Sequence, residues 1–396
     1  MNILIVSAFW PTQSNKISGM FVVQQVAALV QRGCQVTVIV AKTIGKSYSS
    51  HCSVIDLGLN VEFVRLVVVP LFKLPDQLSF LPRAMWLNST IAGLFISREI
   101  RRLLMAGMKP FAGCVIHGER YMGLAVPMWR QYIRGGVALV VHGVDPFLAQ
   151  VTNRRQARDL VRDAGHTCDA VILVGSPLFA HAVSMGLPTA KLHVVANGTA
   201  LPIQQEVSDS QRTLGQARRV VSVSNLIELK GIDDNLRALA QITKRRPDLA
   251  WEYRVVGDGK ERLRLESLAS QLCIADRVRF LGRIPYGETM REIADADIFA
   301  LPSWGEAFGI VYLEAMARMR PVIGCLANGA EDIITHDRDG LLITPRSVAE
   351  LSNALERLIE SPELSQKLGR NARTTAEAYS WDQNVSRMLD LLGLDT

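Results

Sequence analysis

The stretch LPSWGEAFGIVYLEAMARMRPVIGCLANGAED, residues 301–332, decides the fold of this chain of 396 residues. It continues an apolar run that begins at residue 297 and ends before Pro302, which is the pattern of a buried strand. After a loop, apolar side chains recur at helical spacing until Pro321 ends the helix and a second strand begins. A strand, a glycine-bearing loop, a helix and another strand in this order predict an α/β fold with a parallel sheet.

Two glutamates flank the first turns of this predicted helix. Glu306 lies at its mouth, and Glu314 follows with seven residues between them. The unpaired N–H groups and the macrodipole of the helix converge near Phe308, Gly309 and Ile310, so this position favours an anion. A carboxylate there is costly unless it hydrogen-bonds hydroxyl groups or a cation, so we expect one or the other beside Glu306.

Length and composition indicate a globular protein of two domains or one large domain, with 48% hydrophobic and 21% charged residues. No apolar run reaches the length of a transmembrane helix. No cationic segment precedes Ile3, so the apolar N-terminus is interpreted as a first strand rather than a signal peptide. The six cysteines are scattered without a Cys-x-x-Cys pair, which favours reduced thiols over disulfides or a metal site.

The net charge of +6 is unevenly distributed. Residues 1–200 hold 19 Lys and Arg against 9 Asp and Glu, whereas residues 201–396 hold 25 against 29. A basic half suggests an anionic partner, which would be a nucleic acid, a phosphorylated substrate or a membrane surface. Ordinary solvated surface charge is the alternative.

Three residues of the first half follow predicted strands, at the ends where open α/β sheets bind ligands. Gly19 lies between a strand at residues 2–8 and a helix at residues 21–32. A glycine there either lets the backbone approach a phosphate or simply turns the chain. His142 and, as a second-rank candidate, His117 each follow a strand directly, although a lone histidine at such a position is more often structural.

A second α/β series begins at residue 220, after an aperiodic segment at residues 199–218 that we interpret as an interdomain linker. In its first loop, Lys230 is a point charge beside a helix mouth and is suited to a diphosphate. An exposed surface lysine is the alternative. The Gly-Asp-Gly turn at residues 257–259 closes a later strand and is weak evidence of nucleotide binding.

A membrane-binding surface is a further hypothesis for the first half. Residues 66–90 are apolar and carry little charge, and an amphipathic helix is predicted over residues 96–109 with Arg98, Arg101 and Arg102 on one face. Apolar anchors beside a basic face are suited to an anionic leaflet, and a core-packed helix with a solvated basic face is the alternative. The proposed anchors are Phe72, Phe80 and Trp86.

The stretch at residues 301–332 resembles the E-x7-E signature of family 4 glycosyltransferases, which are retaining enzymes of the GT-B fold. The matching residues, in order, are Ser303, Glu306, Phe308, Gly309, Glu314, Ala315, Met316, Pro321 and Val322. A pair of glutamates at this spacing is weak evidence alone, but the whole string after a strand ending in Pro-Ser is a specific match. The resemblance covers essentially the whole chain.

The resemblance implies two Rossmann-like domains facing a central cleft. An N-terminal, acceptor-binding domain would comprise residues 1–198, and a C-terminal, nucleotide-sugar-binding domain would comprise residues 219–378. The linker at 199–218 would join them, and a C-terminal helix at residues 379–396 would cross back to the first domain.

The resemblance also implies roles for individual residues. Glu306 would hold hydroxyl groups of the donor sugar, and His142 would orient that sugar as the second catalytic residue. Glu314 would hold the ribose hydroxyls. The substrate-binding residues would be Gly19, Asn225, Lys230, Arg283, Phe308, Gly309, Ile310, Glu314 and Glu331. The chain departs from the family pattern at Asn225, where an arginine is usual, and at residues 319–320, where a small residue and a glycine are usual.

The implied reaction is transfer of a hexose from a UDP- or GDP-linked sugar to a glycan or lipid-linked acceptor, in cell-surface or extracellular polysaccharide synthesis. No metal or other cofactor is expected, and the Asp-x-Asp sequences at residues 295–297 and 337–339 are interpreted as structural. We expect a cytoplasmic enzyme, peripheral on the cytoplasmic membrane face, without a nucleic-acid partner. The alternatives are a nucleotide-sugar epimerase of the same fold and a non-catalytic sugar-nucleotide-binding module.

Overall fold

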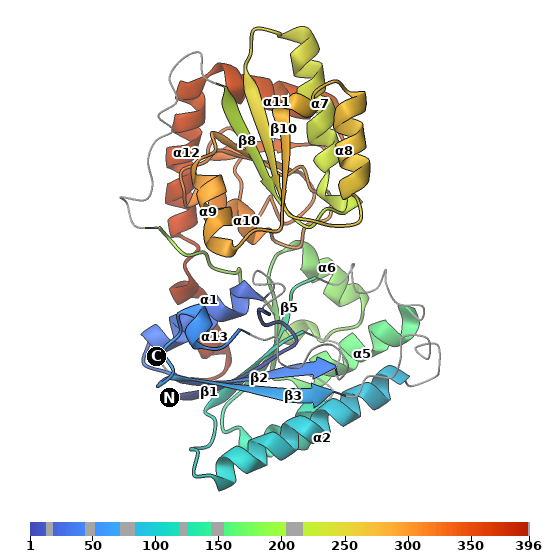
Figure 1. The fold of residues 1–396 in the computed structure, drawn as a ribbon. Helices are drawn as coiled ribbons and strands as arrows, with labels where there is room; N and C mark the ends of the chain where they lie inside the picture. Colours follow the sequence, from blue (N-terminus) through green and yellow to red (C-terminus); the bar gives the residue numbers. More distant parts are fainter. Residues whose placement is uncertain are drawn as a thin grey trace. The chain divides into compact units, whose positions relative to one another are not determined.

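The computed structural model describes residues 1–12, 19–43, 52–71, 84–118, 125–143, 154–202 and 217–394. The chain divides into two compact units, drawn in Figure 1. The first comprises Met1–Gly198 together with Trp381–Thr396, and the second comprises Thr199–Ser380. Most of the expected linker, residues 203–216, lies outside the described residues.

The first unit is built on a parallel sheet in the order β3-β2-β1-β4-β5-β6-β7. Its strands are β1 (Asn2–Ser7), β2 (Gln35–Thr43), β3 (Val64–Leu71), β4 (Gly113–His117), β5 (Val137–Val141), β6 (Ala170–Leu173) and β7 (Leu192–Val194). The central strands are runs of buried Val, Ile and Leu, as expected for a sheet with helices on both faces. The strand order reverses between β1 and β4, and open sheets of this kind bind ligands at that point.

The C-terminal helix belongs to the first unit. Within the described residues of this unit, the other α-helices are α1 (Met20–Gln31), α2 (Ala84–Met105), α3 (Val126–Trp129), α5 (Arg154–Thr167) and α6 (Pro177–Ser184). Helix α13 (Trp381–Leu391) packs against α1, as Figure 1 shows. Trp381 Nε1 donates to Gln24 Oε1 at 2.8 Å, and Arg32 pairs with Asp382 at 2.6 Å. The expected crossing of the last helix back to the first domain is therefore confirmed.

The predicted bounds of the helix at residues 96–109 are wrong, because α2 begins three turns earlier and ends at Met105. Its first half contains Ser, Thr and Gly93, which are poor helix formers, so the helical pattern is weak there. Gly93 is required by packing, because a Cβ atom on it would clash with Met128 and lie 2.7 Å from the Cβ of Ala125. Of the proposed membrane anchors, Phe72, Phe80 and the side chain of Trp86 lie outside the described residues.

The second unit repeats the plan with a parallel sheet in the order β10-β9-β8-β11-β12-β13. Its strands are β8 (Arg218–Val223), β9 (Trp251–Val256), β10 (Val278–Gly282), β11 (Ile298–Ala300), β12 (Val322–Cys325) and β13 (Gly340–Ile343). Its helices are α7 (Ile232–Arg245), α8 (Arg262–Gln271), α9 (Tyr286–Ala294), α10 (Ile310–Met316), α11 (Val348–Glu360) and α12 (Pro362–Glu377). Residues 301–332 thus begin directly after β11 and include the helix α10 and the strand β12.

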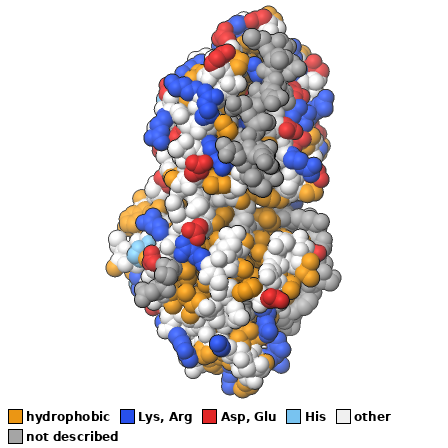
Figure 2. Space-filling view, turned by 90° about the vertical axis from the view of Figure 1, so that its left-hand side faces the viewer, with side chains coloured by type: hydrophobic (Ala, Val, Ile, Leu, Met, Phe, Trp, Pro, Cys, Tyr) orange, Lys and Arg blue, Asp and Glu red, His pale blue; other side chains and the backbone are white. Residues whose placement is uncertain are grey.

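The two units differ in surface charge. On the face drawn in Figure 2, acidic and basic side chains mix over the second unit, whereas the first unit shows fewer acidic ones. The view agrees with the excess of Lys and Arg in residues 1–200. Within the described ranges, no helix is both long enough and apolar enough to cross a membrane.

Candidate active site

In the second unit, loops that follow three neighbouring strands are bonded to one another. The backbone N–H of Trp304 donates to the carbonyl of Leu229 at 3.0 Å, which joins the loop after β11 to the loop after β8. The side-chain amide of Asn328 donates to the carbonyl of Ser303 at 2.8 Å, which joins the loop after β12 to the loop after β11. Predicted site residues from separate motifs are thereby brought together at the carboxyl edge of one sheet.

Lys230 and Glu306 form an ion pair at this edge. Lys230 Nζ lies 2.5 Å from Glu306 Oε2, and the two side chains are only 17% and 16% exposed. The residue after the lysine, Gly231, has a φ of 64°, and a Cβ atom on it would clash with the carbonyl of Pro302. A glycine is therefore needed for the loop that carries Lys230 to lie against the loop that carries Glu306. The carboxylate has a cation beside it, which is one of the two kinds of partner expected from the sequence.

The mouth of helix α10 lies next to this pair. Gly309 precedes the helix with a φ of 91°, and a Cβ atom on it would lie 2.5 Å from the ring of Tyr312 and 3.1 Å from Cγ of Glu306. Phe308 is buried, and Ile310 begins the helix. No side chain caps the helix and no acidic residue lies in its first turn. The predicted anion-binding character of Phe308, Gly309 and Ile310 therefore has no competing side-chain acceptor at the cap.

Glu314 lies further along α10 and is half-buried. The hydroxyl of Tyr286, at the start of α9, donates to Glu314 Oε1 at 2.8 Å. Desolvation raises the pKa of Glu314 to about 7, and the Tyr286 hydrogen bond and nearby Arg318 act in the opposite direction. Tyr286 was not predicted as a site residue, because no motif surrounds it and only the fold brings α9 next to α10.

The remaining predicted residues of this unit lie at its surface. Asn225 and Arg283 are exposed. Glu331 is also exposed, and its Oε2 accepts a hydrogen bond from the backbone N–H of Ala327 at 2.8 Å. Ala327 has a φ of 60°, so the Glu331 side chain stabilises a strained turn after β12. Whether these three residues contact a substrate stays a prediction.

Gly19 caps the start of α1 in the first unit with a φ of 81°. A Cβ atom on it would lie 2.7 Å from the backbone nitrogen of Trp10, so this position requires glycine for the chain's own packing. The structure thus supports the alternative that Gly19 simply turns the chain. Phosphate binding by Gly19 stays a prediction. Its neighbour Ser18 lies outside the described residues.

His142 and His117 lie side by side at the carboxyl ends of β5 and β4. His117 Nδ1 and His142 Nε2 are 3.0 Å apart, and the ring of Phe21 lies 4.3 Å from that of His142, centroid to centroid. Burial lowers the pKa of His142 to about 3, and burial and the neighbouring His142 lower that of His117 well below its ordinary value. Both rings are therefore neutral at neutral pH. Gln25 of α1, which the sequence analysis missed, lies 2.9 Å from His117 Nε2.

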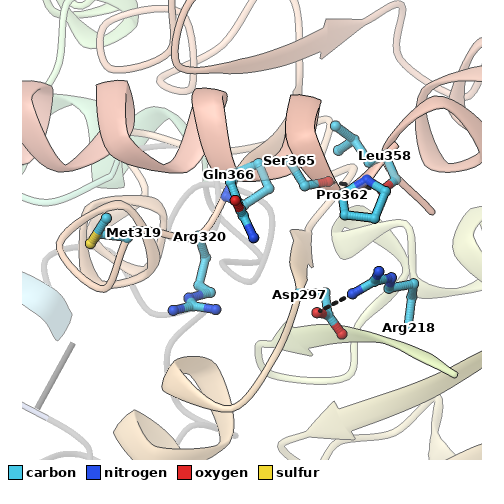
Figure 3. A pocket seen from close by; sticks show the side chains of 9 residues that line it. Arg218, Asp297, Met319, Arg320, Leu358, Pro362, Ser365 and Gln366 are labelled. Atoms are coloured by element: carbon cyan, nitrogen blue, oxygen red, sulfur yellow. Dashed lines mark hydrogen bonds and ion pairs between the residues drawn. The ribbon is translucent and has the colours of Figure 1, made fainter. Parts of the chain in front are cut away.

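Figure 3 shows a pocket elsewhere in the second unit, with Met319, Arg320 and Gln366 near the ion pair of Arg218 and Asp297. Its free space of about 20 Å³ is enough for a water molecule but not for a nucleotide sugar. Arg218 begins β8 and Asp297 directly precedes β11, so the pocket lies at the amino ends of the strands. It is therefore at the opposite edge of the sheet from the Lys230–Glu306 pair.

The Asp-x-Asp sequences have structural partners. Asp297 is buried and accepts from the backbone N–H of Arg219 at 2.7 Å. Asp339 is buried and accepts from the backbone N–H of Thr335 at 2.7 Å and from the hydroxyl of Thr375 at 2.8 Å. In the part of the chain that the structure describes, no group of three or more His, Cys, Asp or Glu is arranged to hold a metal ion.

Two known families match the chain along most of its length. The family described as "Glycosyltransferase Family 4" matches residues 18–201, and the one described as "Glycosyl transferases group 1" matches residues 204–375. The chain belongs to glycosyltransferase family 4. The family predicted from the E-x7-E stretch is therefore confirmed.

Curated relatives of this family 4 protein act on several substrates. A D-inositol 3-phosphate glycosyltransferase of Gordonia bronchialis is 32% identical over 216 residues, which cover 52% of this chain and 47% of the relative. A GDP-mannose-dependent alpha-(1-6)-phosphatidylinositol monomannoside mannosyltransferase of Mycobacterium tuberculosis is 30% identical over 250 residues, covering 60% and 64%. The matches thus span about half to two thirds of the relatives' length.

Solved structures of similar fold cover the family 4 chain almost completely. Sucrose-phosphate synthase from Thermosynechococcus elongatus has a TM-score of 0.74 at 22% identity and covers 99% of this chain and 98% of its own. Anabaena HepE, in complex with UDP and glucose, has a TM-score of 0.71 at 19% identity, with 99% of each chain covered. These likenesses confirm the two Rossmann-like domains of the GT-B fold.

Proposed function

We propose that this family 4 protein is a retaining, metal-independent hexosyltransferase. Its donor would be a UDP- or GDP-linked sugar, and its acceptor a glycan or lipid-linked molecule in cell-surface or extracellular polysaccharide synthesis. The observation that carries the proposal is the Lys230–Glu306 ion pair at the uncapped mouth of α10, with Glu314 on the same helix. Cation, helix mouth and carboxylates together match a ligand made of phosphates and hydroxyls.

Stabilising the leaving group is the main task of such a site. The bond between the anomeric carbon and the phosphate oxygen breaks, and its electron pair stays on the departing diphosphate. Lys230 and the N–H groups at the mouth of α10 would stabilise that charge in a partly desolvated setting, as a metal ion does in other enzymes. Gly19 would let the backbone approach a phosphate. Glu314 would hold the ribose, because two acceptor oxygens match a diol.

Retention would follow from attack on the face that the leaving group vacates. The acceptor hydroxyl attacks the anomeric carbon there and passes its proton to the departing phosphate oxygen. Glu306 would hold donor-sugar hydroxyls and stabilise the positive charge that develops on the ring. His142 would orient the sugar. Asn225, Arg283 and Glu331 would contact the donor from the exposed rim.

A membrane-borne acceptor is supported by helix α2 and by the names of relatives. Leu94 and Met105 of α2 are 57% and 82% exposed, and Arg98 and Arg101 lie exposed at positions that share their face. Relatives are named for phosphatidylinositol mannoside acceptors. We therefore infer peripheral binding to the cytoplasmic face of a membrane, with α2 against an anionic leaflet.

The donor is tested by thermal unfolding in EDTA with UDP-glucose, UDP-galactose, UDP-N-acetylglucosamine, GDP-mannose and ADP-glucose in turn. One of the UDP- or GDP-linked sugars should raise the Tm of the wild type, and Glu314→Gln should lose most of that shift. Glu288→Gln is the control, since Glu288 is exposed on α9 and should keep the shift. Equal shifts in both variants, or none in the wild type, would contradict the proposed donor site. An epimerised sugar in place of a transferred one would favour the epimerase alternative.

A further inference from the structure

A buried chain of hydrogen bonds runs through the first unit and ends at His142. Asn384 of α13 donates its side-chain N–H to the backbone carbonyl of Ala196 at 2.8 Å. Gln25 of α1 donates to Asn384 Oδ1 at 2.8 Å. Gln25 Oε1 lies 2.9 Å from His117 Nε2, and His117 Nδ1 lies 3.0 Å from His142 Nε2. We name these five residues the amide–histidine chain.

The carbonyl of Ala196 gives this chain a direction, because a carbonyl oxygen can only accept. The nitrogen of Asn384 must therefore face Ala196, which leaves its oxygen to accept from Gln25. The oxygen of Gln25 then faces His117, so His117 carries its proton on Nε2 and has a bare Nδ1. His142 must in turn carry its proton on Nε2 to donate to His117. Its own Nδ1 is left as a bare acceptor.

Burial makes this arrangement hard to reverse. The exposed fractions of His117, Gln25 and Asn384 are 1%, 3% and 6%. Turning either amide over would set oxygen against oxygen, or nitrogen against a ring N–H, away from water, and buried polar atoms left without hydrogen bonds destabilise the folded state. Desolvation also keeps both rings neutral at neutral pH, so neither carries a second proton. His142 and Ala196 are the half-buried ends, and His142 is the end whose side chain a ligand can reach.

We propose that Asn384, Gln25 and His117 are positioning residues that fix His142 as the Nε2-protonated tautomer, with Nδ1 as an obligate acceptor for a hydroxyl group of the transferred sugar. The inference rests on the proposed function for the identity of that hydroxyl, and on the geometry alone for the tautomer. It gives the C-terminal helix a part in the reaction, because Asn384 holds the far end of the chain. His142 accepts from the hydroxyl and does not donate to it.

The tautomer is measured directly by ¹⁵N NMR of the full chain labelled at histidine. The two ring nitrogens of a neutral histidine have well-separated shifts, and His142→Asn identifies the resonances among the seven histidines. Wild type should show His142 with a protonated Nε2 and a bare Nδ1. Gln25→Met removes the acceptor for His117 and should give a mixture of tautomers at both rings. Gln24→Met removes the hydrogen bond to Trp381 between the same two helices and should leave the wild-type pattern.

Turnover of the donor that the thermal screen selects gives the second readout. Gln25→Met and His117→Phe should lower kcat about tenfold, with the Kd for the nucleoside diphosphate unchanged because the second unit binds it. His117→Asn should recover part of that loss, since Asn Oδ1 takes the place of Nδ1 and accepts from His142. Gln24→Met should keep the wild-type kcat. If the role of Gln25 is purely structural, kcat should fall equally in Gln24→Met and Gln25→Met. In that case His117→Asn should have the same low kcat as His117→Phe.

The two proposals fail separately. A protonated Nδ1 on His142 in the wild type, or an unchanged NMR pattern in Gln25→Met, overturns the inference even if nucleotide sugar is turned over. If no nucleotide sugar is turned over, the proposed function fails, and the NMR pattern still decides the tautomer.

Discussion

At the scale of single residues, the Lys230–Glu306 pair separates catalysis from binding. Glu306→Gln keeps the size of the side chain but loses its charge, so Lys230 loses its partner and the reacting sugar loses a carboxylate. We expect kcat to fall by about tenfold or more, the equivalent of one strong hydrogen bond, with nucleoside diphosphate affinity close to wild type. Glu314→Gln should instead weaken that affinity. Calorimetry showing no binding by Glu306→Gln and normal binding by Glu314→Gln would reverse the two roles.

The raised pKa of Glu314 also predicts how the free energy of unfolding depends on pH. Its pKa is raised by desolvation from an ordinary 4.5 to about 7, so the folded state holds the proton more tightly than the unfolded state. The stabilisation is present below pH 4.5 and is lost as pH rises through 7. Glu314→Gln stays neutral. The free energy of unfolding of this variant, relative to that of the wild type, should therefore rise by about 2–3 kcal/mol between pH 4.5 and pH 8. Calorimetric unfolding measures this, with the exposed Glu288→Gln as control. A constant difference across that range would show that Glu314 is ionised throughout.

Asn225 tests the departure from the family pattern. Asn225 is exposed and precedes Lys230 in the loop after β8, so Asn225→Arg has room to place a guanidinium near a bound diphosphate. A charge-assisted hydrogen bond is worth about 1.5–3 kcal/mol, and we expect tighter nucleoside diphosphate binding by about tenfold. Asn225→Gln lengthens the side chain without charge and should bind as the wild type does. Unchanged or weaker binding by Asn225→Arg would indicate that another cation, for which Arg283 is the candidate, already serves the diphosphate.

At the scale of elements, α2 is the proposed membrane contact. Changing Arg98, Arg101 and Arg102 to Glu should abolish co-sedimentation with anionic vesicles, because each surface cation contributes about 1 kcal/mol. Arg102 pairs with Glu99 at 2.6 Å, so we expect the smallest share from it. The matched control changes three exposed cations of the second unit, Lys244, Lys367 and Arg370, to Glu. Equal loss in both triple variants, or equal binding to neutral and anionic vesicles, would rule out a specific role for α2.

Among the elements, those with local sequence signals could be predicted and those that depend on packing could not. The strand–loop–helix order around α10 follows from apolar spacing and from Pro302 and Pro321, which are local signals. The start of α2 was missed because its helix depends on packing against α3. Tyr286 was missed because it meets Glu314 only through the packing of α9 on α10. Gln25 and Asn384 are 359 positions apart, so no local pattern relates them.

At the scale of the whole molecule, the two units carry different kinds of chemistry. The second unit holds the Lys230–Glu306 ion pair and the N-terminus of α10, which suit a nucleoside diphosphate. The first unit holds two neutral histidines and the excess of basic residues. This division agrees with the proposed function, in which the second unit binds the donor and the first the acceptor. Under that proposal, the charge excess of the first unit and the carboxylates of the second would belong to one function.

The most direct test of the account is the configuration of the product formed without metal. The wild type, in EDTA, is given the nucleotide sugar selected by the thermal screen and an acceptor, and NMR of the fresh product reports its anomeric configuration. A retaining, metal-independent transferase gives a product with the configuration of the donor, formed in EDTA, and we expect Glu306→Gln to be slower by about tenfold or more. An inverted product, or transfer that needs added manganese or magnesium, would contradict the proposed function.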